Sequence, residues 1–68
     1  MIRGFESRDV IKLLEKRGFV LKSVKGSHHK YIKDSLVVIV PHPKKDLKYG
    51  TVRAILDSAH LSIKELVN

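Results

Sequence analysis

The sequence predicts an α+β domain in which two long helices pack on one face of a three-stranded antiparallel sheet. Two segments, one on each side of the chain's middle, carry apolar residues at helical spacing. Between them lie three short, apolar-rich stretches separated by very short turns, and such turns join antiparallel neighbours. A length of 68 residues and a hydrophobic content of 43% suffice for one small folded unit. We therefore expect a single domain over residues 1–68.

The first helix is expected over Ser7–Arg17. Its apolar residues fall on one face, which consists of Val10, Ile11, Leu13 and Leu14. Ser7 is expected to be the N-cap, and Asp9 lies in the first turn, where the helix dipole favours an anion. Gly18 is expected to end the helix, because glycine adopts the left-handed conformation of a C-terminal cap most easily.

Three strands are expected to follow, and their bounds are Phe19–Val24, His28–Lys33 and Leu36–Val40. Residues 25–27 form the first turn and residues 34–35 the second. The third strand is apolar on both faces, so one of its faces would be exposed in a lone domain. Pro41 and Pro43 end the sheet, because proline has no N–H to donate to a ladder.

A charged loop over residues 44–48 leads to the second long helix, from Tyr49 or Gly50 to Ala59. Its buried stripe is formed by Val52, Ile55, Leu56 and Ala59. Residues 62–65 fit a capping box that opens a short C-terminal helix, ending at about Val67. The two amphipathic helices need one sheet face for burial and leave the other open. This α-β-β-β-α order is that of the double-stranded-RNA-binding fold.

The charge indicates a polyanionic partner. Fourteen Lys and Arg against seven Asp and Glu give a net charge of +7, and nucleic acid is the commonest polyanion for a small basic domain. The chain has no cysteine, which excludes disulfides and thiolate metal sites. No apolar run reaches the length of a signal peptide core or of a membrane span, so we expect a cytoplasmic protein with no membrane association.

Two adjacent histidines, His28 and His29, are the strongest candidates for chemistry. Neighbouring residues of a strand point to opposite sheet faces, so the two cannot serve one site. The large ring of Tyr31 favours burial of the face that it shares with His29. His28 is then expected on the open face beside Lys30, where a histidine can exchange protons with RNA and a lysine can offset phosphate charge.

Interpretations that give these residues no functional role remain open at this point. His28 could be a surface histidine without a role, and His29 is expected to be buried and satisfied by a backbone partner. The segment from Pro41 to Lys45, which includes His42, is either a solvated loop or a contact for the RNA backbone. The residues expected to bind RNA are Lys25, Ser27, Lys30, Lys44, Lys45, Lys48, Thr51 and Arg53.

Neither a metal ion nor another cofactor is expected. The sequence has no His-x-x-x-His pair, and no carboxylate pair lies near the histidines. Asp34 and Asp46 are interpreted as turn residues. Ser27 beside His28 is not expected to act as a nucleophile, because side chains one residue apart in a turn seldom face each other.

Three motifs in order resemble the HicA toxins: residues 26–29 (Gly-Ser-His-His), residues 40–47 (Val-Pro-His-Pro-Lys-Lys-Asp-Leu) and residues 50–56 (Gly-Thr-Val-Arg-Ala-Ile-Leu). The likeness covers about residues 7–61. It implies a double-stranded-RNA-binding-like fold and an mRNA-cleaving toxin whose cognate HicB antitoxin covers the site. It also implies that His28, the first histidine of the Gly-Ser-His-His motif, is the functional one.

The chain departs from this family at one position. Many members have Ala-Gly-Leu after the second helix, whereas this chain has Ala59-His60-Leu61, and a histidine held in a left-handed helix stop costs about 1 kcal/mol relative to glycine. The principal prediction is a metal-independent endoribonuclease toxin that acts on mRNA. The alternatives are a non-catalytic double-stranded-RNA-binding module and a protein-interaction domain whose open sheet face docks a partner.

Overall fold

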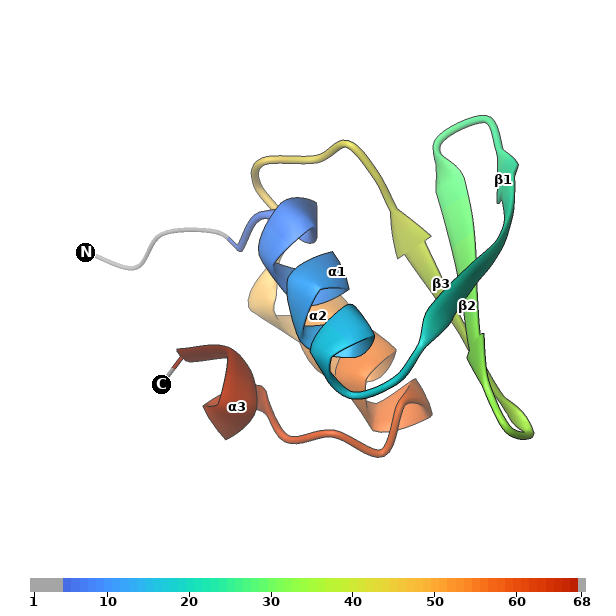
Figure 1. Cartoon of the computed structure of the whole chain (residues 1–68). Helices are drawn as coiled ribbons and strands as arrows, with labels where there is room; N and C mark the ends of the chain where they lie inside the picture. Colours follow the sequence, from blue (N-terminus) through green and yellow to red (C-terminus); the bar gives the residue numbers. More distant parts are fainter. Residues whose placement is uncertain (1–4, 68) are drawn as a thin grey trace.

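The computed structural model describes residues 5–67 and has the predicted α+β order (Figure 1). Its helices and strands are α1 (Ser7–Lys16), β1 (Val20–Lys25), β2 (His28–Lys33), β3 (Leu36–Pro41), α2 (Tyr49–Ser58) and α3 (Ile63–Val67). The sheet order is β1-β2-β3, with both pairs antiparallel. The long helices α1 and α2 pack on β3, and β1 lies farthest from them (Figure 1). The predicted fold class is therefore confirmed.

The register of the sheet assigns each β2 residue to a face, because residues directly opposite in an antiparallel pair share a face. Tyr31 lies opposite Leu21 and Val38, and it is buried against the helices. His28 and Lys30 therefore belong to the other face, which the helices leave open. The expectation that Tyr31 lies on the packed face and His28 on the open one is confirmed.

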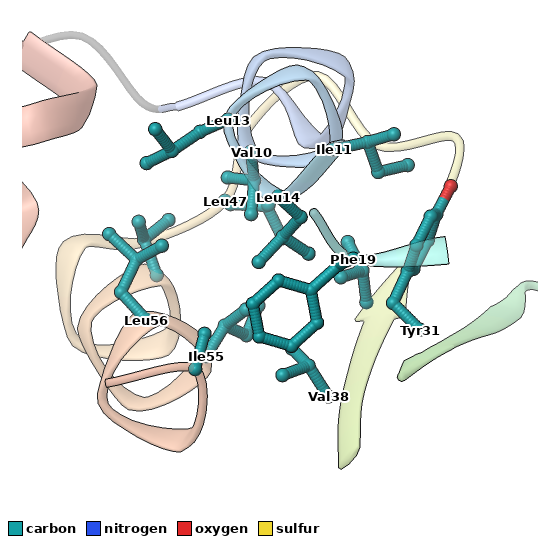
Figure 2. Packing of buried hydrophobic residues seen from close by; sticks show 13 residues of the cluster. Val10, Ile11, Leu13, Leu14, Phe19, Tyr31, Val38, Leu47, Ile55 and Leu56 are labelled. Carbon is teal, nitrogen blue, oxygen red and sulfur yellow. The ribbon is translucent and has the colours of Figure 1, made fainter. Parts of the chain in front are cut away.

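The core is formed where the apolar faces of α1 and α2 meet β3 (Figure 2). All eight residues predicted for the two helix faces are buried, and so are Val38 and Val40 of β3. Phe19 and Tyr31 complete the core from the β1 and β2 side. Burial raises the pKa of the Tyr31 phenol above its usual value near 10, and the negative charge of Glu15 adds to this shift.

Both long helices end in the same hydrogen-bonded motif. At the end of α1, the N–H of Phe19 donates to the carbonyl of Leu14, and Gly18 has a φ of 96°. At the end of α2, the N–H of Leu61 donates to the carbonyl of Leu56, and His60 has a φ of 58°. These are Schellman caps, which require a left-handed residue. The sequence therefore located both helix stops correctly, including the unusual one at His60.

Three local expectations need correction. Ser7 is the first residue of α1 rather than its N-cap: the cap position is Glu6, which makes no side-chain capping bond. The expected strand Phe19–Val24 is shifted by one residue, because Phe19 closes the helix cap and turns into the core. The third strand continues to Pro41, which can pair with His28 as a terminal residue without donating.

The charged loop before α2 is more ordered than its composition indicates. Leu47 is buried and exchanges two backbone hydrogen bonds with Phe5, at N···O distances of 3.0 and 2.7 Å. The capping box at the start of α3 is confirmed, since the N–H of Ser62 donates to the carboxylate of Glu65. Glu65 also forms an ion pair with Arg17, so α3 is tied to the end of α1.

The open face of the sheet combines apolar and basic residues. Val37 and Ile39 of β3 are 51% and 43% exposed, whereas Val38 and Val40 are inaccessible. Val20 of β1, which lies opposite Ile32, is 59% exposed on the same face. The prediction that one face of the third strand is exposed is confirmed, and this face is free to contact another macromolecule.

Candidate active site and RNA-contact surface

His28 begins β2 directly after the Gly26-Ser27 turn, and its side chain is exposed on the open face. Gly26 has a φ of 60°, a left-handed conformation that glycine adopts without steric cost. The tight turn therefore places His28 at the end of the sheet, in a ladder that holds it on both sides. Its partners are Lys25 on β1 and Pro41 on β3.

A β-bulge brings Lys25 to the same face as His28. Leu21 lies opposite Tyr31, but Ser23 lies opposite Lys30, so Lys22 is an extra residue in β1. From Ser23 onward the alternation of faces is reversed, and Lys25 falls opposite His28 instead of on the helix side. Lys30, two residues after His28 in β2, lies on the same face. The open face therefore carries the imidazole of His28 and the ammonium groups of Lys25 and Lys30.

A second polar cluster lies on the helix side of the same end of the sheet. The hydroxyl oxygen of Ser7 lies 2.6 Å from Nδ1 of His42, and the N–H of Lys44 donates to that oxygen at 2.9 Å. The N–H of Ser7 donates in turn to the carbonyl of Lys44 at 2.8 Å. Ser7 is 1% exposed, so this is a buried junction between α1 and the loop after β3.

The side chain of His29 was expected to bond to a backbone group, but its neighbour is instead the ring of His42. His29 is half-buried on the packed face, and its ring lies T-shaped against the ring of His42, with centroids 4.9 Å apart. The N–H of His42 donates to the carbonyl of Ser27 at 2.7 Å. The structure thus brings His29, His42 and Ser7 together, while His28 lies on the opposite face.

The residues expected to bind RNA are all exposed, but they occupy three places. Lys25, Ser27 and Lys30 lie at the first turn and on the open face. Lys44, Lys48 and Thr51 line a surface pocket between the end of β3 and the start of α2. Lys45 lines the adjoining pocket that contains His42, to which Lys44 also belongs. Arg53 instead lines a pocket with His60 and Lys64, between the end of α2 and the start of α3.

The place of Ser7 in a polar cluster was not predictable from the sequence. A serine before an apolar helical repeat is typical of an N-cap, and its partners His42 and Lys44 lie more than 30 residues away in the chain. The only signal in the sequence was the pair of prolines around His42, which restricts that loop. No local feature of the sequence indicates that the loop after β3 packs against the N-terminal end of α1.

Among the side chains that the structure describes, those of residues 5–66, there is no cluster of three or more His, Cys, Asp or Glu residues suited to holding a metal ion. No helix in the described part of the chain is long and apolar enough to cross a membrane.

Comparison with protein families matches residues 7–61 to a family described as the HicA toxin of bacterial toxin–antitoxin systems. A comparison with curated proteins finds no match. The matched region begins at Ser7 and ends at Leu61, so it contains α1, the whole sheet, α2 and its histidine cap. It covers most of the chain and includes every residue of both polar clusters. The chain therefore belongs to the HicA family and is the toxin partner of a toxin–antitoxin pair.

Proposed function

We propose that this toxin is a metal-independent endoribonuclease that cleaves mRNA, with His28 as a general acid or base. The observation that carries the proposal is the position of His28, which is exposed on the sheet face that the helices leave open and lies directly opposite Lys25. Nothing in the core requires an imidazole there. A histidine beside two lysines supplies both proton transfer and positive charge.

The reaction is an internal transfer at a phosphodiester. A base takes the proton of the 2′-hydroxyl, the 2′ oxygen attacks the adjacent phosphorus, and the bond from phosphorus to the 5′ oxygen breaks as that oxygen gains a proton. The products are a 2′,3′-cyclic phosphate and a 5′-hydroxyl. Lys25 and Lys30 would offset the extra negative charge of the phosphorane.

The substrate would be held chiefly through its phosphates. The net charge of +7 and the exposed lysines on either side of the sheet end support this, because cations that contact phosphates supply most of the sequence-independent affinity for nucleic acid. The α-β-β-β-α order, shared with the double-stranded-RNA-binding fold, is compatible with such backbone contacts but does not itself indicate catalysis.

The cognate antitoxin, which we expect to be of the HicB type, would cover the open face around His28. The exposed apolar side chains of Val20, Val37 and Ile39 favour burial against a protein. Lys25 and Lys30, on the same face, favour an acidic one. An antitoxin on this face would exclude RNA from His28 and stabilise a domain whose small core gives limited stability alone.

Incubation of the purified toxin with RNA in EDTA tests the proposal. We expect cleavage to persist in the chelator and to leave 2′,3′-cyclic phosphate or 3′-phosphate ends. Cleavage that stops in EDTA and returns with magnesium would contradict the proposed chemistry. Tight binding of double-stranded RNA with no cleavage would instead support the non-catalytic RNA-binding module.

A further inference from the structure

The hydrogen bonds at Ser7 determine which nitrogen of His42 carries a proton. The backbone N–H of Lys44 can only donate, so it occupies one lone pair of the Ser7 hydroxyl oxygen, at 2.9 Å. The hydroxyl keeps its own proton and, being buried, needs an acceptor. Nδ1 of His42, at 2.6 Å, provides one. A neutral His42 that accepts at Nδ1 carries its proton on Nε2.

The ring of His42 is also fixed in place from two further directions. The ring of His29 packs T-shaped against it, with centroids 4.9 Å apart. The backbone of His42 is tied to the first turn, since its N–H donates to the carbonyl of Ser27 at 2.7 Å. The ring is half-buried, while the hydroxyl at its Nδ1 side is fully buried. The imidazole is therefore oriented before any ligand binds.

The surroundings of this ring favour an anion. His42 lines a small surface pocket with Arg8, Lys44 and Lys45. The one carboxylate among the pocket's lining residues belongs to Glu6, which lies 3.5 Å from the guanidinium of Arg8 and is partly neutralised by it. The pocket and the proposed reaction site share one end of the sheet but lie on its two faces, since Pro41, the neighbour of His42 in the chain, is the ladder partner of His28.

We infer that His42, held as a neutral Nε2–H donor by Ser7, binds an RNA phosphate other than the one that is cleaved, at the same end of the sheet. The lysines of the pocket supply the charge, and Ser7 is the positioning residue. This inference rests on the proposed function, since it places a second phosphate of the same substrate. It does not require His42 to transfer a proton.

The tautomer is measured in the free protein, without RNA. At about pH 8 an ordinary imidazole is neutral, and ¹⁵N chemical shifts then show which ring nitrogen is protonated. We expect Nε2–H at His42 in the wild-type protein and a mixture of tautomers in Ser7→Ala. Nδ1–H at His42 in the wild-type protein would overturn the inference whatever the protein does with RNA.

The binding step is measured with an RNA that carries 2′-deoxy substitutions and cannot be cleaved, at several salt concentrations and about pH 8. His42→Asn retains a group that can bond to Ser7 but lacks Nε2, so the loop stays anchored. We expect about a tenfold loss of affinity, which is typical for one hydrogen bond to a charged group. The slope of log affinity against log salt should not change, because a neutral donor releases no counterion.

Two matched variants complete the experiment. Lys45→Ala should reduce the slope by about 0.7, the value for one phosphate contact on a single strand. His60→Gly, which removes a histidine far from the pocket, should leave affinity and slope unchanged. If wild-type protein binds and cleaves RNA but His42→Asn binds as tightly as the wild type, this inference alone fails. If the wild type binds no RNA, the proposed function fails with it.

Discussion

Lys25 lies directly opposite His28 in the β1–β2 ladder, and it does so because β1 contains one residue more than its partner requires. Regular alternation from Val20 would place Lys25 on the helix side and Val24 beside His28. The extra residue, Lys22, reverses this order, so that an ammonium group and an imidazole share the open face. Bulges often redirect a side chain next to a functional site.

Replacing Lys25 should therefore impair catalysis more than binding. We expect Lys25→Ala to lower the rate of RNA cleavage at saturating RNA by about 10–100-fold, because a cation that stabilises the developing phosphorane charge is lost. Lys22→Ala removes the same charge from the unpaired bulge residue and serves as the control. Equal rate losses in the two variants would mean that Lys25 contributes only to the net charge.

The histidine that caps α2 should weaken the fold. His60 adopts a φ of 58° in the same Schellman motif that Gly18 serves in α1. Glycine has no side chain to clash in this conformation, so His60→Gly should stabilise the protein by about 1 kcal/mol. For a domain of this size the melting temperature should rise by about 4–8 °C. An unchanged or lower melting temperature would show that the imidazole makes a compensating contact.

The raised pKa of Tyr31 predicts a loss of stability in alkali. Burial and the charge of Glu15 favour the neutral phenol in the folded protein. Above about pH 10 the unfolded chain releases this proton while the folded one retains it, so the free energy of unfolding should fall as pH rises. Denaturant unfolding between neutral pH and pH 11 measures this. The fall should be smaller in Tyr31→Phe than in the wild type, and Tyr49→Phe is the control at an exposed tyrosine.

The open face predicts where the antitoxin binds. In a complex with the cognate antitoxin, hydrogen exchange should slow along β1 and β2, where the whole of β1 is exposed in the toxin alone. The melting temperature should also rise with antitoxin concentration, by mass action. Protection limited to the outer surfaces of α1 and α2 would place the antitoxin on the wrong side of the molecule for this proposal.

The sequence predicted the fold well because the relevant signals are local. Two left-handed residues, Gly18 and Gly26, mark a helix stop and a tight turn, and alternating residues around Tyr31 correctly identified the packed face. The helix faces followed from spacing alone, and even the atypical stop at His60 could be located. Each of these features depends on residues within one or two turns of the chain.

The features that the sequence does not predict all depend on contacts between distant segments of the chain. Whether Ser7 caps its own helix or bonds to His42 is decided by where the loop after β3 lies. The pairing of Leu47 with Phe5 has the same origin. The bulge at Lys22 arises from the way β1 pairs with β2. No residue type in β1 indicates its position in the sequence. The placement of Lys25 beside His28 was therefore not predictable.

The separation of His28 from His29 by the sheet allows the central claim to be tested with two adjacent substitutions. His28→Ala should leave the fold and most RNA affinity intact, because the side chain is exposed and the lysines supply the charge. His29→Ala removes a half-buried ring that packs on His42, so it should destabilise the domain by about 1–3 kcal/mol. Its activity should fall only in proportion to the folded fraction.

The decisive measurement is the rate of RNA cleavage by His28→Ala and His29→Ala, with circular dichroism used to normalise each rate to the folded fraction. We expect His28→Ala to be folded and slower than the wild type by about 10²–10⁴-fold, the usual loss when a general acid or base is removed. We expect His29→Ala to cleave at nearly the wild-type rate per folded molecule. A folded, fully active His28→Ala, or a folded but inactive His29→Ala, would contradict the assignment of His28 as the catalytic histidine.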